Sequence, residues 1–138
     1  MTCDSDRYEN NTGEIMKKRV LVVDDEKEIL AILKRFLIRI GYEPFTTDSW
    51  ETAMEHFYEE SFDLAVLDVH MPERDGFQIA KEMKTAKPEQ KILIFTGLDP
   101  SEAYGYLSHA DVEVDDLLYK PFCFRKMQRV IEHTLGDA

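Results

Sequence analysis

The chain has 138 residues, of which 43% are hydrophobic and 33% are charged, and its formal net charge at pH 7 is -11. This length suits one ordinary domain with a buried core. The acidic surface repels phosphate backbones, which argues against nucleic-acid binding by this domain, and no apolar run reaches the roughly 18 residues that span a bilayer.

The N-terminus and the cysteines bear on the cellular compartment. Asp4, Asp6 and Glu9 stand where a secretory signal peptide needs apolar residues. Cys3 and Cys123 form neither a metal-ligand spacing nor a disulfide framework. We therefore expect a cytoplasmic protein with reduced thiols and no membrane association.

The chain divides into a short polar arm and one domain. We expect residues 1–17 to be a disordered N-terminal arm, because this segment is polar and has no hydrophobic period. In residues 18–138, an apolar run, a polar turn and an amphipathic stretch follow one another five times. The apolar runs predict strands at residues 20–23, 42–47, 64–67, 92–95 and 112–119.

The amphipathic stretches predict five helices, at residues 29–40, 50–57, 76–83, 101–109 and 122–135. Gly41 is expected to end the first helix, and either Asp48 or Ser49 to cap the second. Three of the strand runs are almost entirely apolar, as in a parallel sheet covered on both faces. The alternation therefore predicts an α/β fold: a doubly wound five-stranded parallel sheet with five helices and the flavodoxin-like strand order 2-1-3-4-5.

Such a fold places its functional crevice at the carboxyl ends of the strands. The residues that end the first, third, fourth and fifth strands are Asp24-Asp25-Glu26, Asp68, Thr96-Gly97 and Lys120-Pro121, in that order. These four strands are neighbours in the predicted order. We therefore expect their polar groups to meet in one cleft.

The chemistry of these groups points to phosphoryl transfer. Asp24, Asp25 and Asp68 would repel one another, so a cation or raised pKa values must compensate. Oxygen ligands favour a hard ion, and Mg²⁺ is typical where phosphate is handled. Lys120 and Thr96 suit the oxygens of a phosphoryl group, and a central carboxylate can be the nucleophile that forms an acyl phosphate. The residues alone predict a magnesium-dependent phosphoryl acceptor.

Four segments together carry a family resemblance. Residues 20–26 read Val-Leu-Val-Val-Asp-Asp-Glu, residues 67–76 read Leu-Asp-Val-His-Met-Pro-Glu-Arg-Asp-Gly, residues 94–97 read Ile-Phe-Thr-Gly, and residues 120–122 read Lys-Pro-Phe. With these motifs the chain resembles the receiver domain of two-component response regulators from about Lys18 to Leu135. The combination Asp-x-x-Met-Pro-x-x-Asp-Gly is the most specific part of the match.

The resemblance implies a phosphorelay. Asp68 would take a phosphoryl group from a phosphohistidine on a sensor histidine kinase or a histidine phosphotransfer protein. Mg²⁺ would be bound by Asp25, Asp68 and the backbone carbonyl of His70, with Asp24 acting through water. The domain would then be a signalling phosphoacceptor that assists its own phosphorylation and dephosphorylation, rather than a metabolic enzyme.

The resemblance also implies how the signal leaves the site. Lys120 would contact the phosphoryl group, Thr96 would supply the hydroxyl that moves on phosphorylation, and the bond before Pro121 would be cis. Gly76 permits a tight entry into the third helix. Receivers commonly dimerise or dock through the fourth helix, fifth strand and fifth helix, so a homodimer through this face is expected. The resemblance names no downstream effector domain or docking protein.

Two places depart from the family pattern. Leu117 stands three residues before Lys120, where receivers carry the Tyr or Phe that swings inward with the switch hydroxyl. The stretch at residues 108–116 is longer and more acidic than the usual approach to the fifth strand. We expect phosphorylation to survive these changes and the output mechanism to differ.

Other interpretations compete with a receiver. A magnesium-dependent phosphohydrolase usually has a second acid two residues after its nucleophile, where this chain has His70. A module that binds partners without phosphorylation would not need the complete set of acids, threonine and lysine. A flavodoxin would need a phosphate-cradling loop where Asp24-Asp25-Glu26 stand. For Glu26, and for Asp24 taken alone, capping of the following helix is a competing interpretation.

Overall fold

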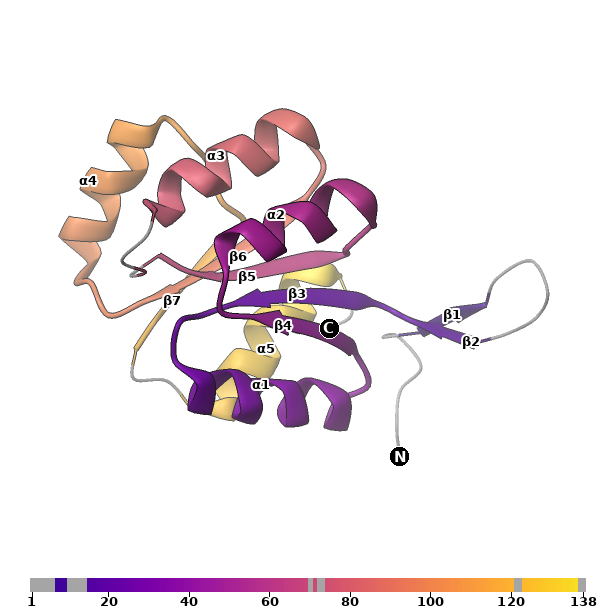
Figure 1. Cartoon of the computed structure of the whole chain (residues 1–138). Coiled ribbons are helices and arrows are strands. Elements are labelled where there is room, and N and C mark those ends of the chain that lie inside the picture. The colour runs from indigo at the N-terminus through magenta and orange to yellow at the C-terminus, as the bar shows by residue number, and fades with distance from the viewer. Residues whose placement is uncertain (1–6, 10–14, 70, 72–73, 121–122, 137–138) are drawn as a thin grey trace.

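A five-stranded parallel sheet with helices on both faces forms the body of the protein (Figure 1). The computed structural model describes residues 7–9, 15–69, 71, 74–120 and 123–136. Its elements are β1 Arg7–Glu9, β2 Ile15–Lys17, β3 Arg19–Val23, α1 Lys27–Arg39, β4 Glu43–Thr47, α2 Trp50–Glu59, β5 Leu64–Asp68, α3 Gly76–Ala86, β6 Lys91–Thr96, α4 Pro100–Ala110, β7 Asp116–Tyr119 and α5 Phe124–Leu135. The strand order β4-β3-β5-β6-β7 confirms the predicted order 2-1-3-4-5.

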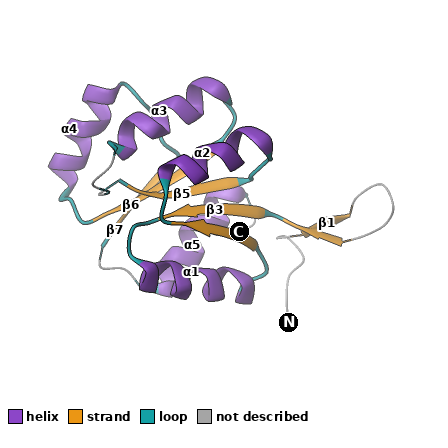
Figure 2. Ribbon diagram, in the orientation of Figure 1, coloured by secondary structure: helices purple, strands orange, loops and turns teal. Residues whose placement is uncertain are grey.

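The strands supply two hydrophobic cores, one on each face of the sheet. Val20 and Val22 of β3 pack with α1 and α5, whereas Leu21 and Val23 pack with α2 and α3. All four side chains are fully buried, and burying each one contributes about 1.5 to 3 kcal/mol. Figure 2 shows the same three layers, with α1 and α5 below the strands and α2, α3 and α4 above them. The nearly continuous apolar runs follow from this double coverage.

The register of the sheet brings the carboxyl ends of four strands to one edge. Val23 pairs with Leu67, which sets the residue after β3 beside the last residue of β5. Asp68 pairs with Phe95, and Thr96 pairs with Tyr119. The residues that follow these pairs therefore surround one space at the end of the sheet.

The helix caps resolve what the sequence left open. The Ser49 hydroxyl accepts a hydrogen bond from the N–H of Thr52 at 3.2 Å, so Ser49 caps α2. Gly41 follows the end of α1 with a φ of 101°, a left-handed value that suits glycine. Asp75 caps α3 through the N–H of Phe77 at 2.9 Å.

Most element boundaries lie within three residues of the prediction, and the start of β7 differs most. β7 begins at Asp116 and not at residue 112, because the chain turns back on α4: the N–H of Val112 donates to the carbonyl of Leu107 at 3.3 Å. α5 begins at Phe124 and not at residue 122. Residues 112–115 thus belong to a loop. The β-branched residues Val112 and Val114 in this loop had indicated a strand.

The N-terminal segment contains two short paired strands that the sequence pattern does not predict. β1 and β2 pair in antiparallel fashion, with Arg7 opposite Lys17, and Figure 1 shows them extending beyond the amino end of the sheet. They lie within residues 1–17, for which a disordered arm was expected; the other residues of that range, apart from 7–9 and 15–17, lie outside the described residues. Three-residue strands carry too few positions for an alternation to be read. In the part of the chain that the structure describes, no helix is both long and apolar enough to cross a membrane.

Candidate functional site

Asp24 follows β3 directly, and its side chain is fully buried. Its Oδ1 accepts a hydrogen bond from the backbone N–H of Glu26 at 2.8 Å. Its own N–H donates to the carbonyl of Thr47 at 3.2 Å, which ties the connection after β3 to the end of β4. The two bonds fix the carboxylate of Asp24 at the carboxyl edge of the sheet.

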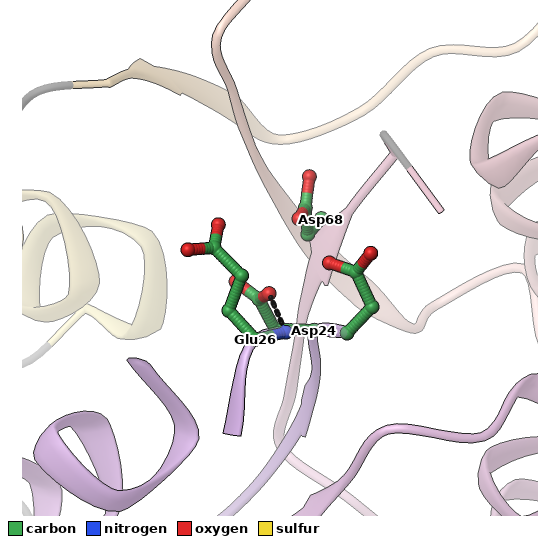
Figure 3. Close-up of side chains that lie close together, drawn as sticks. Asp24, Glu26 and Asp68 are labelled. Carbon is green, nitrogen blue, oxygen red and sulfur yellow. Dashed lines mark hydrogen bonds between the residues drawn. The ribbon is translucent and has the colours of Figure 1, made fainter. Parts of the chain in front are cut away.

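Asp68 is the last residue of β5 and is 2% exposed. Asp24, Asp25, Glu26 and Asp68 each offer a carboxylate oxygen, and these oxygens all lie within 4.8 Å of one another. Figure 3 shows Asp24 and Glu26 on the connection after β3 and Asp68 on the adjacent strand, around the same space. The structure therefore brings together the acids that the sequence places at the ends of two separate strands.

Lys120 is the cation of this cluster. Its Nζ lies 3.3 Å from Oδ2 of Asp68, 3.5 Å from Oδ2 of Asp24 and 3.7 Å from Oε1 of Glu26. The ammonium also lies 4.7 Å from the centre of the Phe95 ring, which forms one wall of its position. One ammonium is thus shared by three carboxylates, and the site keeps an excess of negative charge.

The pKa values reflect this imbalance. The pKa of Asp24 is raised to about 6, chiefly by burial and also by the neighbouring charge of Asp68, although the hydrogen bond from the Glu26 N–H and the charge of Lys120 act in the opposite direction. Burial lowers the pKa of Lys120, but the carboxylates of Asp68 and Asp24 outweigh it, so the net shift is upward. Lys120 is therefore fully charged at neutral pH, and the acids carry the unfavourable electrostatic energy.

Thr96 ends β6 and is fully buried. Its hydroxyl oxygen accepts a hydrogen bond from the N–H of Leu98 at 3.1 Å, and its carbonyl accepts one from the N–H of Lys120 at 2.7 Å. The second bond links the backbones of two predicted site residues directly. A movement at Thr96 would therefore be felt at the backbone that carries Lys120.

Leu117 and Gly76 lie outside the acidic cluster. Leu117 is in β7, opposite Ile94, and it packs against the core under α3 and α4. It also lines a groove of about 550 Å³ together with Tyr104 and Leu107 of α4. Gly76 starts α3, where a Cβ atom would come within 2.6 Å of the Cα of Val69. Glycine is therefore required for the close approach of α3 to the loop after β5.

Of the predicted site residues, the structure groups Asp24, Asp25, Asp68 and Lys120, and it places Thr96 at the end of the next strand. His70 and Pro121 lie outside the described residues, as does the bond before Pro121. For Glu26, helix capping is the competing interpretation from the sequence. As the N-cap of α1 it makes no side-chain capping hydrogen bond, and its carboxylate lies near Lys120 instead. The sequence signal for this position of Glu26 is that it is the third acid of the Asp-Asp-Glu run after the first strand.

The donor set fits a hard divalent cation. The cluster offers carboxylate oxygens from four residues and neither a cysteine nor a histidine side chain among them. Mg²⁺ prefers such ligands and retains several waters, so it needs only one or two of these carboxylates. The excess negative charge gives a cation a favourable position that Lys120 alone does not fill.

Comparisons with known proteins agree with this geometry. The model of a family described as the response regulator receiver domain matches residues 20–132. The alkaline phosphatase synthesis transcriptional regulatory protein PhoP of Bacillus subtilis is 34% identical over 120 residues, which cover 87% of this chain and 49% of that protein. The chain spans about half the length of the curated relatives that it matches.

Solved structures are similar along most of the chain. A CheY-like receiver domain from Methanospirillum hungatei superposes with a TM-score of 0.79 at 27% identity, covering 87% of this chain and 94% of that one. The response regulator TrrA of Thermotoga maritima, solved in complex with Mg²⁺-BeF, has a TM-score of 0.75 at 32% identity, covering 85% and 98%. The family match at residues 20–132 includes Asp24, Asp68 and Lys120.

Proposed function

The chain belongs to the family of response regulator receiver domains, whose general function is to accept a phosphoryl group, and on this premise we propose that Asp68 is its phosphoacceptor. The observation that carries the proposal is the position of Asp68. Its carboxylate is buried at the end of a central strand, 3.3 Å from the only ammonium of the described acidic cluster. A carboxylate held in this way can attack a phosphorus atom without rearrangement of the backbone.

The proposed donor is a phosphohistidine on a sensor histidine kinase or a histidine phosphotransfer protein. An oxygen of Asp68 attacks the phosphorus atom, the new P–O bond forms as the P–N bond breaks, and the electron pair of that bond stays on the imidazole nitrogen. Lys120 stabilises the oxygens of the phosphoryl group by charge, and the Thr96 hydroxyl donates a hydrogen bond to one of them. The product is an acyl phosphate on Asp68.

Mg²⁺ is the proposed cofactor. Asp25 and Asp68 would hold it directly and Asp24 through water, and the carbonyl of His70, which lies outside the described residues, would complete the protein ligands. Bound there, Mg²⁺ supplies positive charge that balances the oxygens of the phosphoryl group. With the same groups in place, the domain would also assist hydrolysis of its own acyl phosphate, and it would turn over no metabolite.

Two surfaces support the proposed partners. Ile32 of α1 and Phe124 of α5 are exposed apolar side chains, and Phe124 packs on the ring of Phe36 at a centroid distance of 4.8 Å. Phe124 lies four residues after Lys120 in the sequence, which supports docking of the donor protein on this part of the molecule.

The face of α4, β7 and α5 suits a second copy of the chain. Its groove under α4 includes Asp111 and Glu113, whereas α5 presents Lys126 and Arg129. Opposite charges on one face allow a two-fold contact in which each patch meets its complement. Homodimerisation through this face, in response to phosphorylation at Asp68, is therefore the proposed route of output, and Leu117 in the groove would take part in it.

The test is the intact mass of the protein after incubation with acetyl phosphate, with and without Mg²⁺. We expect the wild-type protein to gain one phosphoryl group only when Mg²⁺ is present. Asp68→Asn should abolish the gain, because the amide cannot act as the nucleophile. Asp48→Asn is a matched control: Asp48 is exposed just after β4, at the same end of the sheet, and its variant should be labelled like the wild type.

Either of two results would contradict the proposal. Labelling of Asp68→Asn to the wild-type level would place the phosphoryl group on another residue. A wild-type protein that gains no mass from acetyl phosphate is then incubated with a phosphorylated histidine phosphotransfer protein. Absence of transfer in that second experiment would favour a module that signals without phosphate.

A further inference from the structure

Glu26 occupies the first position of a helix without capping it. It is the N-cap residue of α1, with extended backbone angles, and its side chain makes no capping hydrogen bond to the described helix. Its neighbour Asp24 instead accepts the N–H of Glu26 itself. The side chain of Glu26 is therefore free of the role that an acid at a helix N-terminus usually takes.

The Glu26 carboxylate is directed to the acidic cluster instead. In Figure 3 the side chain extends beside Asp24 toward the level of Asp68. Its Oε1 lies 3.7 Å from Nζ of Lys120, and the side chain is 59% exposed, whereas that of Lys120 is 22% exposed. Glu26 thus contacts the ammonium with a largely exposed side chain, whereas the two aspartates that contact it are buried.

This arrangement gives Lys120 an inner and an outer set of partners. The buried side chains of Asp24 and Asp68 hold the ammonium at 3.5 and 3.3 Å. The exposed side chain of Glu26 contacts it at 3.7 Å. An incoming phosphoryl group must recruit the same ammonium, so it competes with Glu26 for a single cation. The phosphoryl group and Glu26 also repel each other, because both are negatively charged.

We propose that Glu26 is a positioning residue that acts through Lys120: it holds the ammonium in the resting protein and releases it when a phosphoryl group binds at Asp68. The inference rests on the proposed function. It has two consequences of opposite sign. Glu26 adds attraction for a divalent cation in the resting site, and it opposes the binding of an anionic phosphoryl group.

The first test measures the two affinities separately in Glu26→Gln, a nearly isosteric change that removes the charge. Titration calorimetry with MgCl₂ gives the cation affinity, and titration with beryllofluoride at saturating Mg²⁺ gives the affinity for a phosphoryl mimic. We expect Mg²⁺ binding to weaken about 2- to 5-fold and beryllofluoride binding to tighten about 2- to 5-fold, as for one partly exposed ion pair. Both titrations are made without any phosphodonor.

Glu28→Gln is the matched control. Glu28 is an exposed acid in the first turn of α1, so the variant changes the net charge and the helix terminus in the same way as Glu26→Gln. We expect both of its affinities to stay within about 1.5-fold of the wild type. Equal effects from the two variants would mean that only the overall charge matters, which would overturn the inference.

The second test observes Lys120 itself, through the NMR signal of its Cε group. Glu26→Gln should shift this signal in the resting protein, and Glu28→Gln should not. After addition of Mg²⁺ and beryllofluoride the signals of wild type and Glu26→Gln should converge, because the ammonium has left Glu26. Signals that differ as much in the bound state as in the resting state would show that Glu26 keeps its hold on Lys120, and the inference would fail.

The outcomes separate the inference from the function on which it rests. A wild-type protein that binds beryllofluoride, together with a Glu26→Gln variant of unchanged affinities, contradicts only the role of Glu26. A wild-type protein that neither binds beryllofluoride nor gains a phosphoryl group contradicts the proposed function, and the inference falls with it.

Discussion

The two ends of the central sheet handle charge in opposite ways. At the amino end, the half-buried charges of Arg19, Lys87 and Asp63 have partners that satisfy them. At the carboxyl end, among the described residues, a cluster of four acids has the ammonium of Lys120 near three of them. Both ends are built from the same strands and lie on the same two cores. The difference therefore comes from the side chains at the strand termini and not from the architecture.

The amino end is organised by Arg19, the first residue of β3. Its guanidinium lies 2.7 Å from a carboxylate oxygen of Glu60, donates to the carbonyl of Ser61 at 3.2 Å and stacks over the ring of Phe62. Its backbone N–H donates to the Asp63 carboxylate at 2.7 Å. These contacts connect β3 to the segment between α2 and β5, which stabilises the pairing of two central strands.

The carboxyl end instead stores unfavourable electrostatic energy. Its two buried acids, Asp24 and Asp68, are held by strand register and by a backbone hydrogen bond to Asp24, so they cannot move apart. Sites that bind charged ligands are often less stable than they could be, because the ligand supplies the missing charge. The comparison teaches that the sheet is stabilised at one end and left incomplete at the other, where the proposed cation and phosphoryl group would bind.

The largest expected effect comes from Asp24→Asn. Without Mg²⁺, we expect this variant to be more stable than the wild type at pH 7 by about 2 to 3 kcal/mol, because it removes a buried charge whose pKa is raised to about 6. The asparagine Oδ1 can still accept the Glu26 N–H. Urea unfolding in EDTA measures the difference. Asp25→Asn, an exposed neighbour, should stay within about 0.5 kcal/mol of wild type.

The difference in stability between the wild type and Asp24→Asn should also depend on pH. Since the pKa of Asp24 is higher in the folded protein than its ordinary value of 3.8, its contribution to stability is fully present below pH 3.8 and is lost as the pH rises through about 6. Without Mg²⁺, the wild type should therefore gain stability relative to Asp24→Asn between pH 7 and pH 5. A gap that stays constant over this range would contradict the assignment.

An intermediate effect of the opposite sign is expected at the amino end. Arg19→Met keeps the apolar stem but removes the guanidinium, so the hydrogen bonds to Glu60 and Ser61 are lost. We expect a loss of about 1 to 2 kcal/mol in the free energy of unfolding, since the pair is partly exposed. Urea unfolding measures it, and Arg35→Met, on the exposed face of α1, is the control. If Arg19→Met were more stable than the wild type, the charges at the amino end would not stabilise the fold, and the contrast with the carboxyl end would be wrong.

The sequence predicts the carboxyl end far better than the amino end. Asp24, Asp68 and Lys120 could be grouped because each directly follows an apolar run, and parallel strands bring such residues to one edge. The contacts of Arg19 with Glu60 and of Lys87 with the carbonyl of Glu60 join segments about 30 to 40 residues apart with no local pattern. They depend on how α2 and α3 end in space, which periodicity does not specify.

The start of β7 and the contact of Glu26 with Lys120 could not be predicted for a related reason. The strand signal at Val112 and Val114 is overridden by tertiary contacts, because both side chains pack against the core from a loop. Glu26 follows the local rule for a helix start, yet Lys120, 94 positions away in the sequence, determines where its carboxylate lies. Local rules thus place residues on elements, whereas electrostatic partners require the assembled edge.

The smallest expected effect tests whether the amino end is fully satisfied. Thr134 lies in the last turn of α5, which Lys18 ties to the start of the sheet through the carbonyl of Leu135 at 3.3 Å. In the part of the chain that the structure describes, the buried hydroxyl of Thr134 has no hydrogen-bond partner. An unpaired buried hydroxyl costs stability, and valine has nearly the same shape without it.

Thr134→Val should therefore stabilise the protein by about 0.5 to 1 kcal/mol. Urea unfolding with and without Mg²⁺ measures the change, which should be the same in both conditions because Thr134 lies far from the acids. Val130→Thr, a change of the same two residue types on the same helix at a half-buried position, should not stabilise the protein. If Thr134→Val lowers the stability, its hydroxyl contributes to folding, and the amino end is then satisfied more completely than its hydrogen bonds indicate.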